Sequence, residues 1–519
     1  MDTIVVLDFG GQYCHLIARR IRDLGVYSEI LPFDVDKSKI NNLDLKGIIL
    51  SGGPSSVYDQ DSPKLSNWFF EFISKEKIPI LGICYGHHLI MHQIGGIIEP
   101  HDNKEYGKTE LEIIESHLLL DDLDRVEVVW MSHGDQVKKL PDGFKILAKT
   151  ETCPIAAYGS IERKIFGVQF HPEVVHTIKG NQVLDNFITK IAKAKKEWKL
   201  EDWIERSIKQ IKQEIGSDNR VILGLSGGVD SSVTAILLHK AIGERLHCIF
   251  VNNGLLRKNE DKQVQETFKD KLGFKNFHYV DAENLFLEKL KGVEDPEEKR
   301  RIIGHTFIEV FENKTLELEK EHPDIKYLAQ GTIYPDRVET AATSKASAKI
   351  KSHHNLTLPD DMKLKIIEPL KDLYKDEVRK IGLKLGLDSE LIERHPFPGP
   401  GLAVRCLGAV EKERLETLKD ADHILIEEIR KAGIYNDLWQ IFCVFLPVKT
   451  VGIMGDYRTY EYICAIRGVE SRDAMTANFA KLDWDLLERI GTRIINEVKG
   501  FNRVVYDISN KPPSTIEYE

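Results

Sequence analysis

Residues 226–232 read SGGVDSS, between the apolar run VILGL at 221–225 and a helix-like stretch at 233–242. The order strand, glycine turn, helix predicts a cradle for phosphate groups. Gly227 and Gly228 lack a Cβ, so backbone N–H groups can close on an anion, and the helix N-terminus adds partial positive charge. A Walker A loop has Lys before its Ser/Thr, whereas this loop has Asp230, which argues against a γ-phosphate grip of the kinase type. The predicted nucleotide site consists of Ser226, Gly227, Gly228, Val229, Asp230, Ser231 and Ser232.

Composition limits the class of protein. A chain of 519 residues exceeds what one hydrophobic core usually supports, so we expect several domains. The net charge of −10, with both signs spread along the chain, gives no basic surface for nucleic acid. Seven cysteines without CxxC spacing argue against a zinc site and a disulfide framework. No apolar run approaches a membrane span. We therefore expect a cytoplasmic protein without nucleic-acid or membrane partners.

The alternation of apolar runs and amphipathic stretches predicts an α/β fold. We expect two doubly wound, mostly parallel-sheet domains, at residues 1–196 and 197–395, followed by a small C-terminal α+β domain at 396–519. The lysine-rich segment 191–199 has helical propensity and is interpreted as a junction and not as a flexible linker. The run HPFPGPG at 395–401 marks the second boundary.

A cysteine in a glycine-flanked turn is the first catalytic candidate. Residues 82–86 read GICYG and connect the strand predicted at 78–83 to a helix-like stretch at 89–93, in the manner of a G-x-S-x-G elbow with Cys as nucleophile. Such a turn lifts the side chain above the sheet edge, at a helix N-terminus that lowers a thiol pKa. Cys84 is therefore a candidate attacking thiolate.

The base is expected at the end of another strand. The strand predicted at 165–170 leads into His171, Pro172 and Glu173, and in an extended backbone residues two apart point to the same side. Glu173 can therefore orient His171 in a Cys-His-Glu relay. The turn SGGP at 51–54 offers free N–H groups, and we expect Gly53 and Tyr85 to form the oxyanion hole. A lone cysteine is usually a small hydrophobe, but the combination favours catalysis.

These motifs resemble known families. GICYG, GVQFHPE (167–173) and SGGPSSVYD (51–59) resemble the class I glutamine amidotransferases, and SGGVDSS resembles the loop of PP-loop ATP pyrophosphatases. Their combination in one chain resembles the glutamine-hydrolysing GMP synthetase family. Further matching blocks are at 251–260, 329–340, 351–356, 395–405 and 508–519, so the resemblance covers essentially the whole chain.

The resemblance implies a reaction and its substrates. ATP adenylates XMP, and ammonia from glutamine hydrolysis displaces AMP to give GMP, in the final step of de novo guanine nucleotide synthesis. ATP with Mg²⁺ is then a cosubstrate, without a prosthetic group, and Asp230 is suited to position Mg²⁺. The resemblance assigns XMP binding to Arg257, Lys511, Ile516 and Glu517, assigns a lid to Asp336, Arg337 and Glu339, and implies a homodimer formed by the C-terminal domain.

The chain departs from the family pattern at two places. Asn252 replaces a common Asp, and His87-His88 replaces the usual Met-Gln, whose Gln helps to hold substrate glutamine. One hypothesis is that a neutral His88 binds glutamine and that its protonation near pH ~6.5 raises the glutamine KM. The alternative is that His88 packs inside and that backbone groups near Gly53 and residues 132–135 hold glutamine.

Other functions share parts of these motifs. A PP-loop tRNA thiolase normally uses paired cysteines and a basic surface, which this sequence lacks. An N-terminal-nucleophile asparagine synthetase needs Cys after the initiator Met, where this chain has Asp2. An NAD synthetase shares the loop but usually couples to a nitrilase-type glutaminase. A scaffold with degenerate sites is disfavoured because Cys84, His171, Glu173 and Asp230 are all present.

Overall fold

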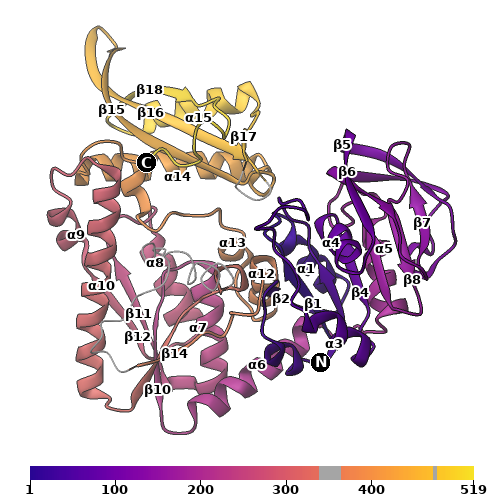
Figure 1. The fold of residues 1–519 in the computed structure, drawn as a ribbon. Coiled ribbons are helices and arrows are strands. Elements are labelled where there is room, and N and C mark those ends of the chain that lie inside the picture. Colours follow the sequence, from indigo (N-terminus) through magenta and orange to yellow (C-terminus); the bar gives the residue numbers. More distant parts are fainter. Residues whose placement is uncertain (338–363, 472–475) are drawn as a thin grey trace. The chain divides into compact units, whose positions relative to one another are not determined.

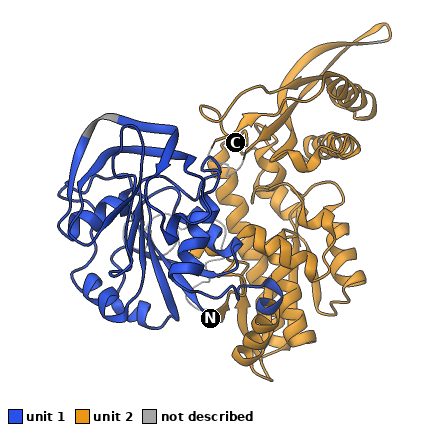
Figure 2. Cartoon of the chain, turned by 90° about the vertical axis from the view of Figure 1, so that its right-hand side faces the viewer, with its two compact units in different colours: residues 1–203, 338–346 blue, residues 204–337, 347–519 orange. Residues whose placement is uncertain are grey.

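The computed structural model describes residues 1–337, 364–471 and 476–519. The chain divides into two compact units, whose described parts are residues 1–203 in the first and residues 204–337, 364–471 and 476–519 in the second (Figure 2). The division into 1–196, 197–395 and 396–519 stays a prediction. Within the described residues, no helix combines the length and the apolar content needed to span a membrane.

A nine-stranded sheet lies at the centre of the first unit (Figure 1). Its order is β2 (Tyr27–Pro32), β1 (Thr3–Asp8), β3 (Leu45–Leu50), β4 (Ile80–Ile83), β9 (Ile165–Val168), β8 (Ala157–Ser160), β7 (Lys145–Lys149), β5 (Ile97–Ile113) and β6 (Val126–Lys139). Neighbours from β2 to β9 are parallel, and those from β9 to β6 are antiparallel. Strands β4 and β9 are buried throughout, which explains their unbroken apolar sequences.

Three loops leave the same edge of this sheet. Strands β3, β4 and β9 are parallel neighbours, so their carboxyl ends lie side by side. The glycine turn 51–54 follows β3, Cys84 follows β4 and precedes α4 (Tyr85–Gln93), and His171 comes shortly after β9. Ligand sites of open α/β sheets are found at such edges. The topology therefore brings together the catalytic candidates of the first unit.

A parallel sheet also supports the phosphate loop of the second unit. Its order is β12 (Phe277–Asp281), β11 (Leu246–Asn252), β10 (Arg220–Gly224), β13 (Ile325–Ala329) and β14 (Lys365–Ile367). All these pairs are parallel. The loop follows the central strand β10 and leads into α7 (Val229–Ile242), which is buried along most of its length. The long charged helix α10 (Pro296–Glu321) belongs to the same unit.

The C-terminal part of the second unit forms a four-stranded sheet covered by two helices (Figure 1). The elements are β15 (Gln440–Met454), β16 (Tyr457–Glu470), β17 (Asn478–Phe479), β18 (Phe501–Tyr506), α14 (Lys412–Lys431) and α15 (Trp484–Glu497). One apolar core joins this sheet to the parallel sheet, since it contains Ile222 of β10, Ile303 of α10 and Ile441 of β15. The predicted α/β class with a smaller C-terminal α+β part is confirmed.

Beyond Ile191, the junction at residues 191–199 does not form a helix, despite the helical propensity of its residues. The preceding helix ends at Ile191, Lys193 has φ 56°, and α6 (Leu200–Ile215) begins only after the segment. Tertiary contacts hold this backbone instead. The N–H of Lys195 donates to the Asp2 carboxylate at 2.8 Å, and the N–H of buried Trp198 donates to the Gly25 carbonyl at 2.8 Å. These contacts outweigh the weak helical preference of the lysines.

Candidate active sites

The turn after β4 holds Cys84 in a strained backbone conformation, with φ 52° and ψ −105°. Two glycines make the turn possible. A Cβ on Gly82 would lie 2.4 Å from the Gly86 carbonyl oxygen, and a Cβ on Gly86 would lie 2.6 Å from Leu50 Cβ. The N–H of Cys84 donates to the Val168 carbonyl of β9 at 2.9 Å. The turn therefore has the form that the G-x-C-x-G pattern predicts.

His171 lies next to this thiol and is paired with Glu173. Nδ1 of His171 is 2.7 Å from Oε1 of Glu173, and both side chains are buried. Burial alone would lower the pKa of His171, but the Glu173 carboxylate and the adjacent Cys84 sulfur raise it to about 11. The imidazole thus holds its second proton well above neutral pH. This environment favours an imidazolium beside the sulfur of Cys84.

The glycine turn after β3 runs beside the same two side chains. A Cβ on Gly52 would lie 3.4 Å from Cε1 of His171 and 3.7 Å from Cβ of Cys84. Gly53 approaches Tyr85, because its Cβ would lie 3.4 Å from the Tyr85 ring. Within the described residues, neither the N–H of Gly53 nor that of Tyr85 donates to another backbone carbonyl. Two N–H groups near the thiol are therefore available to an oxyanion.

His88 is buried on α4, the helix that begins directly after Cys84. Burial and, second, the nearby His133 lower the pKa of His88 to about 3. The hypothesis that its protonation near neutral pH raises the glutamine KM is therefore wrong, because the ring stays neutral throughout that range. Within the part of the chain that the structure describes, Nε2 of His88 has no hydrogen-bond partner.

The serines of the SGGVDSS loop form hydrogen bonds within the loop. Gly227 has φ 76°, and Gly228 is the N-cap of α7. The Oγ of Ser226 accepts from the N–H of Gly228 at 3.3 Å and lies 3.0 Å from Oγ of Ser231. Ser232 donates its hydroxyl to the Gly228 carbonyl at 2.8 Å. Backbone N–H groups of Val229 and neighbouring residues lie at the N-terminus of α7, a position suited to phosphate.

Sequence reasoning missed the partner of Asp230. Oδ2 of Asp230 is 2.5 Å from Nζ of Lys375, the first residue of α12 (Lys375–Lys384). Oδ1 of Asp230 is buried and has no partner within the described residues. Nearby, Asn252 donates to the Asp281 carboxylate at 3.2 Å and accepts from the Gly254 N–H at 3.0 Å. The loop therefore places a lysine cation and a carboxylate oxygen without a protein partner side by side.

Two arginines flank Phe397 in the second unit. The guanidinium carbon of Arg257 lies 4.1 Å from the centre of the Phe397 ring, and that of Arg405 lies 5.1 Å from it. Arg257 also donates to the His395 carbonyl at 3.2 Å. Burial, the largest effect, lowers the pKa of Arg257. The buried Arg405, which lies in the block HPFPGPGLAVR, was not singled out from the sequence. Both guanidinium groups thus stack against one aromatic ring.

The C-terminal segment packs against these arginines. Glu517 accepts two hydrogen bonds from Arg405, at 3.0 and 2.9 Å, and one from Gln440 at 2.7 Å. Ile516 packs against the buried cluster of Phe442, Val444 and Ala465. Lys511 pairs through its backbone with Ala477, at 2.8 and 3.0 Å. Arg257 and Glu517 are thus connected through Phe397 and Arg405, and Ile516 precedes Glu517 in the chain.

The lid candidates are only partly described. Arg337 forms a 2.7 Å ion pair with Asp372 and lies 4.9 Å from the centre of the Tyr334 ring. The carboxylate of Asp336 accepts from the N–H of Ile333 at 3.3 Å. Glu339 lies outside the described residues, as does the block at 351–356. Asp336 and Arg337 therefore both form contacts with neighbouring residues.

Three family descriptions match successive parts of the chain. Residues 5–191 match "Glutamine amidotransferase class-I", residues 199–298 match "NAD synthase", and residues 427–518 match "GMP synthase C terminal domain". The first match contains Cys84, His171 and Glu173, and the second contains the SGGVDSS loop. The three matches follow the order expected from the sequence motifs.

Full-length relatives decide the family. The chain is 53% identical over 520 residues to the GMP synthase [glutamine-hydrolyzing] of Brachyspira hyodysenteriae, covering 100% of this chain and 99% of the relative. It is 53% identical to the protein of the same name from Thermosipho africanus, covering 100% of both, and 52% identical to that of Aquifex aeolicus, covering 99% of both. This chain belongs to the glutamine-hydrolysing GMP synthase family.

Proposed function

We propose that this chain makes GMP from XMP, ATP and glutamine, with the glutaminase in residues 1–196, the ATP pyrophosphatase in 197–395 and an XMP-binding and dimerisation domain in 396–519. Glutamine and water give glutamate and ammonia in the first domain. ATP adenylates XMP in the second and releases pyrophosphate, and ammonia displaces AMP to leave GMP. Family membership over the full length supports this reaction.

In the proposed glutaminase, the Cys84 thiolate attacks the amide carbon of glutamine and forms a C–S bond. The N–H groups of Gly53 and Tyr85 bind the oxyanion. His171 then protonates the departing nitrogen, so ammonia leaves and a thioester remains for water to hydrolyse. The observation that carries this proposal is the buried 2.7 Å contact between His171 and Glu173 beside Cys84, together with the raised pKa of His171.

In the proposed synthetase, the loop 226–232 binds the pyrophosphate part of ATP through the N-terminus of α7. Mg²⁺ fits this site, because Oδ1 of Asp230 is a buried carboxylate oxygen without a protein partner. When bound, the ion would neutralise phosphate charge. Lys375, paired with Asp230 through the other oxygen, is suited to contact the same phosphates.

We propose that XMP binds near Phe397. Arg257 and Lys511 are cations suited to the XMP phosphate, and Ile516 and Glu517 belong to the same segment as Lys511. Glu517 is held by the buried Arg405, so its orientation is fixed before XMP binds. Asp336, Arg337 and Glu339 are proposed to cover the site as a lid.

His88 is proposed to contact glutamine through its free Nε2. A neutral imidazole that accepts at one nitrogen and donates at the other has the hydrogen-bonding capacity of one face of a Gln amide. Its buried position on α4, the helix that begins next to Cys84, supports this assignment.

We also propose a homodimer formed through the C-terminal sheet. Strands β15 and β16 form a long hairpin that extends beyond the rest of the sheet (Figure 1). This hairpin exposes Ile453, Tyr457 and Tyr460, at 77%, 80% and 61%. Such a row of apolar side chains is typical of a protein interface. The seven cysteines are free and buried, which fits the reducing cytoplasm.

One assay tests the function. XMP, ATP, Mg²⁺ and glutamine are mixed with the full chain, and GMP, AMP, pyrophosphate and glutamate are quantified. We expect equal amounts of all four products, and no GMP when XMP is omitted. Absence of GMP from this mixture, with amidation of nicotinic acid adenine dinucleotide when that compound replaces XMP, would contradict the proposal.

A further inference from the structure

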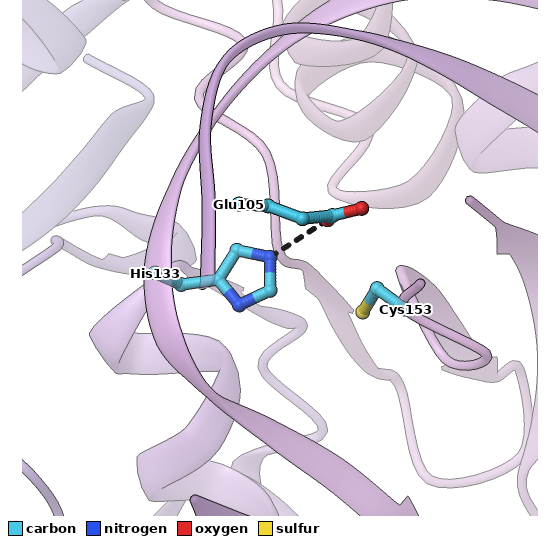
Figure 3. A group of neighbouring side chains, drawn as sticks. All are labelled: Glu105, His133 and Cys153. Atoms are coloured by element: carbon cyan, nitrogen blue, oxygen red, sulfur yellow. Dashed lines mark hydrogen bonds and ion pairs between the residues drawn. The ribbon is translucent and has the colours of Figure 1, made fainter. Parts of the chain in front are cut away.

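A buried carboxylate and a buried histidine lie close to the proposed glutaminase site. Nε2 of His133, on β6, is 3.0 Å from Oε2 of Glu105, on β5 (Figure 3). Their side chains are only 4% and 10% exposed. Neither residue belongs to the Cys-His-Glu relay. A charge pair so well shielded from water requires a physical reason, because burying charged groups is unfavourable unless they are fully hydrogen-bonded.

Both ring nitrogens of His133 have a hydrogen-bond partner. Nδ1 lies 2.9 Å from the Asp135 carbonyl oxygen, while Nε2 faces the Glu105 carboxylate. The ring therefore connects the backbone of its own strand to the side chain of Glu105.

Glu105 has the complementary arrangement. Its second carboxylate oxygen, Oε1, accepts from the hydroxyl of Thr150 at 2.7 Å and from the hydroxyl of Thr152. Burial would raise the pKa of Glu105, but these hydrogen bonds and the one from His133 lower it to about 2. The carboxylate therefore stays ionised, with both oxygens hydrogen-bonded.

The pair controls the backbone next to the nucleophile. The carbonyl of Ser132, the residue before His133, accepts from the thiol of Cys84 at 3.6 Å. The side chain of Asp135 accepts from Ser56 at 2.6 Å, and Ser56 follows the turn that contains Gly53. The ring of His133 thus fixes residues 132–135 between the thiol and the loop of the proposed oxyanion hole.

His133 also influences α4. His87 and His88 are buried near His133, and after burial the nearby histidines, His133 among them, are the next causes that lower their pKa values. These surroundings keep His88 neutral, as the proposed contact with glutamine requires.

We infer that Glu105 and His133 form a hydrogen-bonded pair that positions residues 132–135 around Cys84 and glutamine. Both are positioning residues, since neither needs to touch the reacting atoms. This inference rests on the proposed glutaminase and adds two residues to it.

A metal centre is the competing interpretation of these residues. Ligand atoms of Glu105, His133 and Cys153 lie within 4.8 Å of one another (Figure 3). A metal ion would need the Cys153 thiolate, but burial, and then the Glu105 charge, raise the pKa of this thiol to about 12. It would also displace the proton between His133 and Glu105. The hydrogen-bonded pair needs no ion.

The test replaces Glu105 by Gln in the full chain. Glu105→Gln is expected to lower kcat/KM for glutamine hydrolysis at least tenfold, while GMP formation from added ammonium stays within twofold of the wild type. Glu99→Gln is the matched control, since Glu99 lies on the same strand and pairs with Lys138 of β6 at an exposed site. The control is expected to remain within twofold in both assays. Equal glutaminase rates in wild type and Glu105→Gln would overturn the inference.

Glu105→Asp gives a second test, because it keeps a carboxylate at this position. Its kcat/KM for glutamine hydrolysis is expected to lie between those of Glu105→Gln and the wild type. A folded Glu105→Asp variant with a glutaminase loss as large as that of Glu105→Gln would overturn the inference.

Metal analysis separates the two interpretations. The purified full chain is expected to contain no stoichiometric metal, and a chelator should leave glutaminase unchanged. One metal ion per chain that is lost in Cys153→Ser would assign a metal centre and refute the pair. A wild type that hydrolyses no glutamine at all would instead refute the proposed function.

Discussion

The strained turn at Cys84 leads to a stability prediction with an unusual sign. A non-glycine residue at φ 52° and ψ −105° carries strain of about 1–3 kcal/mol. Glycine adopts such angles freely but loses about 0.5–1 kcal/mol more chain entropy than alanine on folding. Cys84→Gly should therefore be more stable than Cys84→Ala by about 0.5–2 kcal/mol. At an ordinary buried position the order is the reverse.

Cys153 provides the matched control, because it is a buried cysteine of the same unit without a positive φ. Calorimetry of the full chain should place the melting transition of the first unit about 1–8 °C higher for Cys84→Gly than for Cys84→Ala, using about 2–4 °C per kcal/mol. Cys153→Gly should melt below Cys153→Ala. If Cys84→Gly also melts below Cys84→Ala, the turn is unstrained and the nucleophile elbow is refuted.

Three further predictions concern the other proposed sites. Asp230→Asn should remove pyrophosphate release from ATP but spare glutaminase, and normal ATP turnover would refute the assignment of the loop. Deleting residues 510–519 should raise the KM for XMP at least tenfold without changing glutaminase. Arg405→Met should have the same effect, because Glu517 then loses its two charged hydrogen bonds. An unchanged KM would remove this segment from the XMP site. Because the pKa of His88 is about 3, the glutamine KM of wild type and of His88→Gln should show parallel pH profiles between pH 6 and 8. If the glutamine KM of the wild type alone rose towards pH 6, His88 would titrate in that range.

The catalytic motifs could be predicted from the sequence because each is local. Gly82 and Gly86 are needed within one turn, where any Cβ would collide with backbone or with Leu50, so the sequence carries the signal directly. His171 and Glu173 are two residues apart on an extended segment, and their contact follows from strand geometry. The same holds for the serines of the phosphate loop, which bond within the loop itself.

Contacts between distant segments could not be predicted in this way. Lys375 reaches Asp230 across 145 positions, and Arg405 reaches Glu517 across 112, without any periodic pattern that joins them. The pKa of His88, on α4, depends on burial and on His133, which belongs to the distant strand β6. The segment 193–199 is set by contacts with Asp2 and Gly25, which outweigh its local helical preference.

The division of labour between the two sites is the central claim, and Cys84→Ala tests it most directly. GMP formation by this variant is measured with glutamine and, separately, with ammonium as the nitrogen source. The account predicts that glutamine-dependent formation is lost because no thioester can form, while ammonium-dependent formation continues within twofold of the wild-type rate. Equal loss of both activities, or glutamine-dependent formation that persists without the thiol, would contradict it.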